Sequence, residues 1–202
     1  MGSINVYSEA IKIFGEQDPV VMAAKGGAVY DRETRKIRLQ YLNTFVEVDF
    51  PTGEVHTDGE TLTRNEIVVI LHYLASDSGV KPRDSWISFI QLPDGPHHHN
   101  PFVIEALKPL AEDFGEYPEL FKERVLGIGG LANGMGDFGA TVCVFPNLPI
   151  AVCLWAGDDE FPGNANILFD IMAPLHLTTA DLYVLGIEIS RKIRQVSGQQ
   201  FA

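Results

Sequence analysis

Residues 28–56 read AVYDRETRKIRLQYLNTFVEVDFPTGEVH, and this stretch decides the fold class of the chain. Apolar and polar residues alternate in four short runs, as they do in half-buried β-strands, and turn-forming residues separate the runs. The predicted strands are Ala28–Tyr30, Lys36–Tyr41, Thr44–Phe50 and Glu54–His56. Because connections this short join only antiparallel neighbours, we expect an antiparallel meander.

Helical patterns flank this meander on both sides. Before it, Val6–Phe14 has apolar residues at helical spacing, and Asp18-Pro19 predicts the cap and first turn of a second helix. After it, residues 62–67 (LTRNEI) form a capping box, in which Thr63 caps the helix and Glu66 reaches back to the cap.

The second half of the chain repeats this separation of strands from helices. Its predicted elements are a strand Trp86–Leu92, a helix opening at Asn100-Pro101 that Pro109 divides, a helix Tyr117–Leu126, strands Ala140–Phe145 and Ile150–Ala156, an apolar segment Ile167–Met172, and a final helix capped by Thr178 with Asp181 at its third position. We therefore predict a single α+β domain over residues 1–202, with antiparallel sheets and helices packed on one face.

The charge balance limits the possible partners. The 202 residues include 15 Lys+Arg and 27 Asp+Glu, which gives a net charge of −12. This charge repels polyphosphate and anionic lipid, so neither nucleic acid nor a membrane is expected as a partner. The chain starts without the basic and apolar regions of a signal peptide, and no apolar run is long enough to cross a bilayer. We therefore expect a cytoplasmic protein.

Three adjacent histidines are the most suggestive chemical feature. In an extended loop, His97 and His99 would project to the same side and His98 to the other, so two of them could share one metal. A single axial ligand to a haem or a corrinoid would need the fewest residues. A solvated loop is the structural alternative. If a metal binds here, the candidates for a third ligand are Asp158, Asp159, Glu160 and His176.

Carboxylates and tryptophans could complete such a site. The loop GDDEFPGNAN, residues 157–166, offers oxygen ligands suited to a hard divalent cation, although it lacks the EF-hand spacing. Its structural alternative is a turn whose carboxylates cap backbone amides. Trp86 and Trp155 could form walls around a cofactor or belong to the core. His72 lies beside the apolar stripe of its helix, as expected for a boundary histidine with its hydrogen bonds satisfied.

Other reaction classes find little support. The glycine-rich stretch GIGGLA, residues 127–132, matches a dinucleotide pattern, but it leaves a helix instead of a strand. There is no G-x-S-x-G elbow. Cys143 and Cys153 are too few for an iron–sulfur cluster. A hairpin with its loop at Asn147–Pro149 would place them opposite each other, as reduced packing residues.

Five sequence blocks carry a family resemblance: LHYL (71–74), WISF (86–89), VCLWAGDDEFP (152–162), NILFD (166–170) and LTTADL (177–182). In this order they resemble the domain of unknown function 3786 family, found mainly in anaerobic microbes. Some members are joined to an iron–sulfur cluster segment, which implies a place in anaerobic redox or corrinoid metabolism. This chain departs from that pattern, since its two cysteines lie in predicted strands.

These observations predict a non-catalytic binding or accessory protein of anaerobic metabolism. We expect a corrinoid, a haem, a divalent metal or another small ligand in a cleft between the sheet and its helices. The expected ligands are His97 and His99, with walls from Trp86 and Trp155 and anionic or metal contacts from Asp158, Asp159 and Glu160. Two alternatives remain open. One is a metal-dependent hydrolase that uses the same residues, and the other is a module that binds a protein partner and no small ligand.

Overall fold

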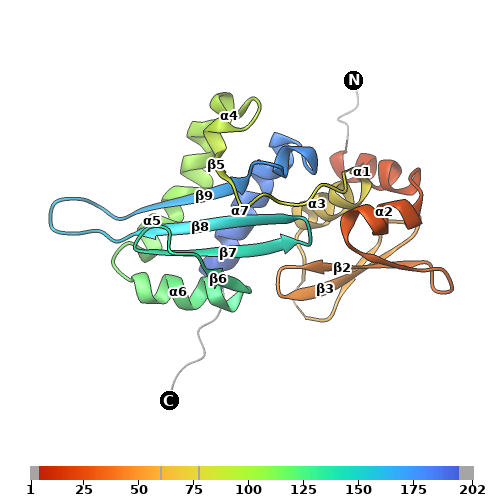
Figure 1. The fold of residues 1–202 in the computed structure, drawn as a ribbon, viewed down its shortest axis with the longest axis horizontal. Helices are drawn as coiled ribbons and strands as arrows, with labels where there is room; N and C mark the ends of the chain where they lie inside the picture. The colour runs from red at the N-terminus through yellow and green to blue at the C-terminus, as the bar shows by residue number, and fades with distance from the viewer. Residues whose placement is uncertain (1–4, 60, 77, 196–202) are drawn as a thin grey trace, which may run out of the picture.

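The N-terminal part of the protein consists of three helices and a small sheet. The computed structural model describes residues 5–59, 61–76 and 78–195. The helices are α1 (Val6–Gly15), α2 (Pro19–Gly26) and α3 (Arg64–Ala75). The antiparallel sheet has the order β1-β2-β3-β4, formed by β1 (Val29–Asp31), β2 (Lys36–Tyr41), β3 (Thr44–Asp49) and β4 (Val55–Thr57). The predicted meander and its flanking helices are thus confirmed (Figure 1).

A larger antiparallel sheet dominates the second half, with the order β5-β9-β8-β7-β6. Its strands are β5 (Trp86–Ser88), β6 (Gly130–Ala132), β7 (Phe138–Phe145), β8 (Leu148–Trp155) and β9 (Asn164–Asp170). The helices α5 (Lys108–Phe114), α6 (Pro118–Gly127) and α7 (Thr179–Gln195) pack on one of its faces. The α+β class with antiparallel sheets is confirmed.

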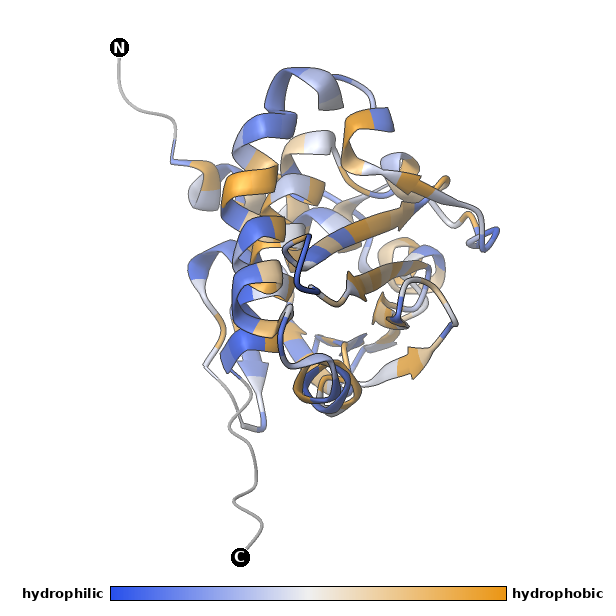
Figure 2. Ribbon diagram, turned by 90° about the vertical axis from the view of Figure 1, so that its left-hand side faces the viewer, coloured by the Kyte–Doolittle hydropathy of each residue, from blue (hydrophilic) through white to orange (hydrophobic). Residues whose placement is uncertain are grey.

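Apolar side chains from both sheets and from the helices form one continuous buried cluster. Figure 2 shows the strands of the larger sheet as mostly hydrophobic, whereas the helices turn hydrophilic sides outward. None of the helices in the described part of the chain combines the length and the apolar character that a bilayer-spanning segment needs.

The histidine segment differs from the prediction, because it is helical. The strand predicted to continue to Leu92 ends at Ser88, and a 3₁₀ turn (Phe89–Gln91) follows. Helix α4 (Gly95–Phe102) begins six residues before Pro101, the predicted first residue of the helix. Pro96 lies in the first turn of α4, where a proline favours helix initiation. Gly95 is required there, since a Cβ would lie 2.2 Å from the carbonyl oxygen of Phe89.

Pro109 divides the following helix, as predicted. A π-helical turn (Val103–Leu107) connects α4 to α5, and the Lys108 N–H donates to the Val103 carbonyl. A proline lacks the N–H that would continue the normal ladder, and the wider turn accommodates this loss.

The predicted pairing of the two cysteines is wrong. The β7–β8 hairpin turns at Pro146-Asn147, two residues in place of the predicted three, and a register irregularity lies between Cys143 and Phe145. Cys143 therefore lies opposite Pro149, and Cys153 lies opposite Gly139. Both thiols are free. Burial raises the pKa of each thiol, to about 11 for Cys153, which keeps them protonated.

Gly186 allows α7 to pack closely against the aromatic core. A Cβ at this position would lie 2.5 Å from Cε2 of Phe102. Glycine to alanine in a helix interior ordinarily stabilises by about 0.5–1 kcal/mol. At Gly186 we expect the opposite, a loss of about 1–3 kcal/mol in the free energy of unfolding from overpacking, measured by urea denaturation.

The control for this prediction makes room for the added methyl group. Phe102→Leu removes the ring atoms that the Cβ would meet, so adding Gly186→Ala to Phe102→Leu should cause no further loss. A Gly186→Ala variant more stable than the wild type would contradict the packing argument.

Candidate functional site

The predicted histidine ligands do not converge. Successive residues of a helix are about 100° apart, so His97 and His99 on α4 project about 200° apart, toward nearly opposite sides. His97 and His98 are exposed. His99 is half-buried, and its Nδ1 is buried without a hydrogen-bond partner in the described structure. The prediction that His97 and His99 project to one side of an extended loop is therefore wrong.

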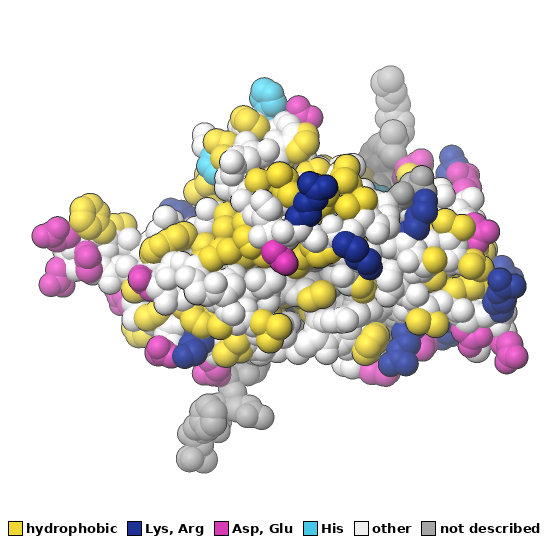
Figure 3. Space-filling view, viewed as in Figure 1, with side chains coloured by type: hydrophobic (Ala, Val, Ile, Leu, Met, Phe, Trp, Pro, Cys, Tyr) yellow, Lys and Arg dark blue, Asp and Glu magenta, His cyan; other side chains and the backbone are white. Residues whose placement is uncertain are grey.

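The predicted carboxylate ligands lie far from α4. The tip of the β8–β9 hairpin carries Asp158, Asp159 and Glu160, and it extends away from the body of the molecule. Helix α4 lies at the upper edge of the molecule in the same view (Figure 1). Figure 3 shows the acidic side chains gathered at that tip and the histidines above, well separated. Asp158 Oδ1 accepts hydrogen bonds from the N–H groups of Phe161 (2.7 Å) and Glu160 (2.9 Å), which lower its pKa. This is the capped turn that the sequence offered as the alternative.

The two tryptophans lie at opposite ends of β9. Trp86 on β5 lies opposite Asp170, and Trp155 on β8 lies opposite Asn164. Six residues of strand separate these positions, about 20 Å, so one ligand cannot contact both rings. His176, the other candidate ligand, is buried, and its Nε2 lies 3.0 Å from the carbonyl oxygen of Val80.

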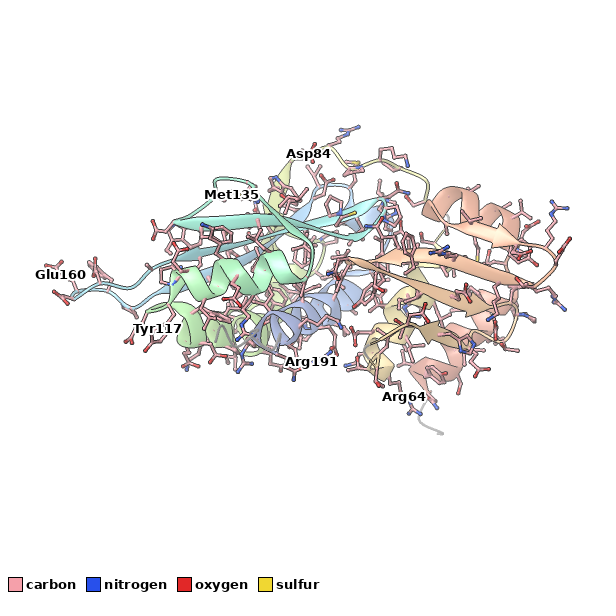
Figure 4. All side chains as sticks on the ribbon, turned by 90° about the horizontal axis from the view of Figure 1, so that it is seen from below. Arg64, Asp84, Tyr117, Met135, Glu160 and Arg191 are labelled. Carbon is pink, nitrogen blue, oxygen red and sulfur yellow. The ribbon has the colours of Figure 1, made fainter. Side chains whose placement is uncertain are left out.

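The structure instead forms a cleft between the small sheet and the ends of α6 and α7. We call it the central cleft; it has a volume of about 420 Å³. One wall is the β2–β3 turn with the end of β4, and the other is the C-terminal ends of the two helices. It is lined by Tyr41, Leu42, Asn43, Thr44, Thr57, Asp58, Leu62, Gly127, Ile128, Lys192 and Gln195. Figure 4 shows Arg191 on α7, which lies between α6 and the small sheet.

A buried carboxylate organises the floor of the central cleft. Glu66 is 1% exposed, and its Oε1 accepts hydrogen bonds from the Tyr41 hydroxyl (2.8 Å) and the Lys192 ammonium (3.0 Å). Its Oε2 accepts from the Thr63 N–H (2.8 Å) and from Arg191 (3.2 Å). Four donors therefore satisfy the lone pairs of one carboxylate and join α3, α7 and β2.

Glu66 and Tyr41 do not change their protonation state near neutral pH. Burial raises the pKa of Glu66, but the hydrogen bonds from the Thr63 N–H and Lys192 outweigh burial, so the pKa lies below its ordinary value. Burial and the adjacent Glu66 charge raise the pKa of Tyr41 well above 10. The carboxylate thus stays ionised and the phenol stays protonated.

The turn that forms one wall of the central cleft is strained. Leu42 has a φ of 55°, a left-handed conformation that a bulky side chain rarely adopts. Its N–H donates to the Val144 carbonyl of the larger sheet (3.0 Å), and the Asn43 side-chain amide donates to the Gly127 carbonyl at the end of α6 (3.0 Å). The Asn43 bond joins the two walls of the cleft, and the Leu42 bond ties the turn to the larger sheet. Backbone strain is concentrated at functional sites in many proteins.

Among the described residues, one group of side chains away from the predicted ligands has the spacing of metal ligands. Ligand atoms of Asp49, Glu54 and His56 lie within 4.8 Å of one another, on the small sheet. His56 Nε2 is 2.9 Å from Asp49 Oδ2, and the Lys36 ammonium is 3.6 Å from Asp49 Oδ1. The Lys36 ammonium already pairs with Asp49, and the group is largely exposed, so we do not assign a metal to it.

A half-buried ion pair joins α3 to the start of α7. His72 Nδ1 lies 2.7 Å from Asp181 Oδ1, and the Thr178 hydroxyl donates to Asp181 Oδ2 (2.6 Å). The hydrogen bond with Asp181 raises the pKa of His72 above 6.5. Burial raises the pKa of Asp181, but the hydrogen bonds from His72 and Thr178 hold it below 3.8. His72 is the satisfied boundary histidine that the sequence predicts.

A family model described as Domain of unknown function (DUF3786) matches residues 18–192. The chain belongs to the DUF3786 family. The match confirms the family resemblance, and it includes every residue that lines the central cleft except Gln195. Comparison with curated proteins and with solved structures finds no match for this DUF3786 chain.

Sequence reasoning identified Glu66 of the DUF3786 chain only as a helix cap and missed its partners. One signal was available: Glu188 and Lys192 lie on the same side of the final helix as the apolar Leu185 and Ile189. Charged residues four apart on a buried side require partners elsewhere. The pattern could indicate a buried ionic cluster, but it could not identify Tyr41 or Glu66 as the partners.

The Glu66–Lys192 pair predicts an asymmetric response to mutation in the DUF3786 chain. Lys192→Met removes a donor from a buried carboxylate and should lower the free energy of unfolding by about 3 kcal/mol, measured by urea denaturation. The double variant Glu66→Gln/Lys192→Met removes the buried charge as well, and it should be more stable than Lys192→Met.

An exposed pair provides the matched control. Lys36 lies 3.3 Å from Glu47 on the small sheet, with both side chains partly exposed. Lys36→Met should cost less than about 1 kcal/mol. Equal losses for the two lysine variants would show that the Glu66 network contributes no more than a surface pair.

The His72–Asp181 pair should make stability depend on pH. Because the pKa of folded His72 is raised, its contribution is complete below 6.5 and is lost as the pH rises through the raised value. The pKa of Asp181 is lowered, so its contribution is present above 3.8 and is lost as the pH falls through the lowered value. The destabilisation by His72→Asn in urea denaturation should therefore be largest at about pH 4.5–6 and smaller at about pH 9.

Asp181→Asn provides the control for this pH dependence. In the Asp181→Asn background, the cost of His72→Asn should no longer decline toward high pH. An unchanged decline would assign the pH dependence to another partner of His72.

Proposed function

We propose that this DUF3786 chain is a non-catalytic binding or accessory protein that holds a small polar ligand in the central cleft. The observation that carries the proposal is the floor of the cleft, where Lys192 (6% exposed) and Tyr41 (1% exposed) meet the buried carboxylate of Glu66. Burying ions in this way adds little to stability compared with apolar packing. A binding role explains why polar groups line the floor of the cleft.

The lining indicates the chemistry of the ligand. Hydroxyl and amide groups of Asn43, Thr44, Thr57 and Gln195 and the exposed carboxylate of Asp58 supply hydrogen bonds. Leu42, Leu62 and Ile128 supply apolar contacts. A volume of about 420 Å³ lies within the range of small-molecule sites, roughly 300–1,000 Å³. The ligand is therefore a small molecule with a polar side and an apolar side.

The electrostatics favour binding over proton transfer. A general acid or base works best with a pKa near the working pH. The pKa of Glu66 is lowered and the pKa of Tyr41 is raised far above neutrality, so neither changes protonation near pH 7. At the floor of the cleft, Glu66 supplies a fixed charge to Lys192 and Tyr41, and the Tyr41 phenol stays protonated.

A metal-containing cofactor at His97 and His99 remains a prediction, with less support than a ligand in the central cleft. Their opposite directions on α4 leave at most one of them for a given metal, as an axial ligand to a haem or corrinoid. The place in anaerobic metabolism that the family resemblance implies is likewise part of this proposal.

The test is a thermal-shift screen of the full chain with a panel of small carboxylic acids, amino acids and amines. We expect members of one of these classes to raise the Tm of the wild type, because a ligand that binds the folded state stabilises it. Thr44→Trp fills the cleft from β3 and should abolish the shift.

Thr34→Trp is the matched control, since it adds the same side chain in the exposed turn between β1 and β2. It should leave the Tm shift unchanged. A shift that survives Thr44→Trp would place the ligand elsewhere, and a panel without any effect on the wild type would contradict the proposal.

A further inference from the structure

Two charged residues line the central cleft in the described structure, Lys192 and Asp58. Lys192 is 6% exposed, and its ammonium lies 3.0 Å from Oε1 of the buried Glu66. Asp58, in contrast, is exposed directly after β4, and its carboxylate forms no hydrogen bond or ion pair with another described residue. The positive charge of the lining is therefore compensated within the protein, whereas the negative charge of Asp58 is available to a ligand.

The arginines in the last turns of the two helices do not change this balance. Arg191 on α7 lies 3.2 Å from Oε2 of Glu66, and Arg194 on the same helix pairs with Asp113. Arg124 belongs to the last turn of α6, but it does not line the cleft. A carboxylate ligand would therefore have to compete with carboxylates of the protein for a cation.

Two hydrogen-bond donors of the lining are also used within the protein. The Tyr41 hydroxyl donates to Glu66 (2.8 Å), and the side-chain amide of Asn43 donates to the Gly127 carbonyl (3.0 Å). Gln195 accepts a hydrogen bond through its side-chain oxygen, which leaves its NH₂ group to donate. The lining thus keeps neutral donors for a ligand, but its one uncompensated charge is an acceptor.

The two helices that form one wall add negative potential to the cleft. Helix α6 ends at Gly127 and α7 ends at Gln195, and both of these residues line the cleft. The last carbonyl groups of a helix have no partner within the helix, and the macrodipole places about half a negative charge at this end. The C-terminal ends of both helices therefore favour a cation over an anion.

The apolar part of the lining sets the second requirement for the ligand. Leu42, Leu62 and Ile128 belong to the turn, to the segment before α3 and to the end of α6, so apolar side chains come from both walls. Burial of methylene groups of a ligand against these side chains is favourable. A ligand that satisfies both requirements carries a cation on an aliphatic chain.

We propose that the ligand of the central cleft is a short aliphatic amine, whose ammonium pairs with Asp58 and whose alkyl chain contacts the apolar side chains of the lining. This inference rests on the proposed function, because it names the ligand class of the same site. An ion pair with an exposed carboxylate adds little affinity by itself. Burial of the alkyl chain therefore supplies most of the affinity, and Asp58 supplies the selectivity against anions.

Three ligands with the same alkyl chain test the ligand class: butylamine, butyrate and butan-1-ol. Each is titrated into the full chain near pH 7, and binding is followed by the rise in Tm. The dissociation constant of butylamine should be about tenfold lower than that of butyrate, because Asp58 attracts the ammonium and repels the carboxylate. Butan-1-ol should lie between the two, and Thr44→Trp should abolish the effect of butylamine.

Asp58→Asn tests the residue assigned to the ammonium, and it should remove most of the preference for butylamine over butyrate. Asp84→Asn is the matched control, because it changes the net charge by the same amount at another exposed aspartate. Figure 4 shows Asp84 on the opposite side of the molecule from Arg191 of α7. Asp84 has a φ of 53°, a conformation that asparagine also adopts, so this variant should fold and keep the preference.

The outcomes separate this inference from the proposed function. Butyrate that binds as tightly as butylamine would overturn the amine class, and a preference that survives Asp58→Asn would overturn the pairing with Asp58. In both cases the proposed function stands if Thr44→Trp blocks binding. If none of the three butyl ligands raises the Tm of the wild type, the amine inference fails, and the wider panel of acids and amino acids decides the proposed function.

Discussion

The carboxylate of Glu66 is the group on which both halves of this structure depend. It begins α3 by bonding to the Thr63 N–H, and the same oxygens hold Lys192 and Arg191 on α7 and the Tyr41 hydroxyl on β2. A buried ion is tolerated only when its hydrogen bonds are complete, and here four donors complete them. If α3, α7 or β2 moved, this ion would lose a partner. The relative position of the three elements is therefore fixed by solvation of one charge as well as by apolar packing.

The sequence predicts much of the fold because local patterns and tertiary packing agree. The capping box at Thr63, the Asp18-Pro19 helix start and the alternation in residues 28–56 each form the expected element. Agreement of this kind between local preference and final structure is typical of natural sequences. The failures occur where tertiary contacts decide. Helix α4 starts early at Gly95, where the backbone of Phe89 approaches too closely for any side chain. The irregular β7–β8 register separates Cys143 from Cys153.

The candidate site was less predictable than the fold, for a physical reason. The sequence shows conspicuous candidates in His97, His99 and the carboxylates at 158–160. They lie far apart in the fold, because the histidines are on a helix and the carboxylates are at the tip of a hairpin. The residues that the structure does bring together, Tyr41 and Lys192, are separated by most of the chain. Nothing in a helical or strand period encodes such a contact. A buried charge on an apolar helix side indicates that a partner exists, and only the fold identifies it.

The small sheet and the larger sheet differ in the charge that they carry. The central cleft is formed by the small sheet and by the ends of α6 and α7, and none of its lining residues belongs to strands β5–β9. The distribution of charge follows the same division: the groups that need solvation or a ligand gather at the small sheet and α7, and the larger sheet is left almost without them. A chain with 21% charged residues that keeps five strands nearly free of charge concentrates its charge elsewhere, and burial of β8 on both faces accounts for this separation.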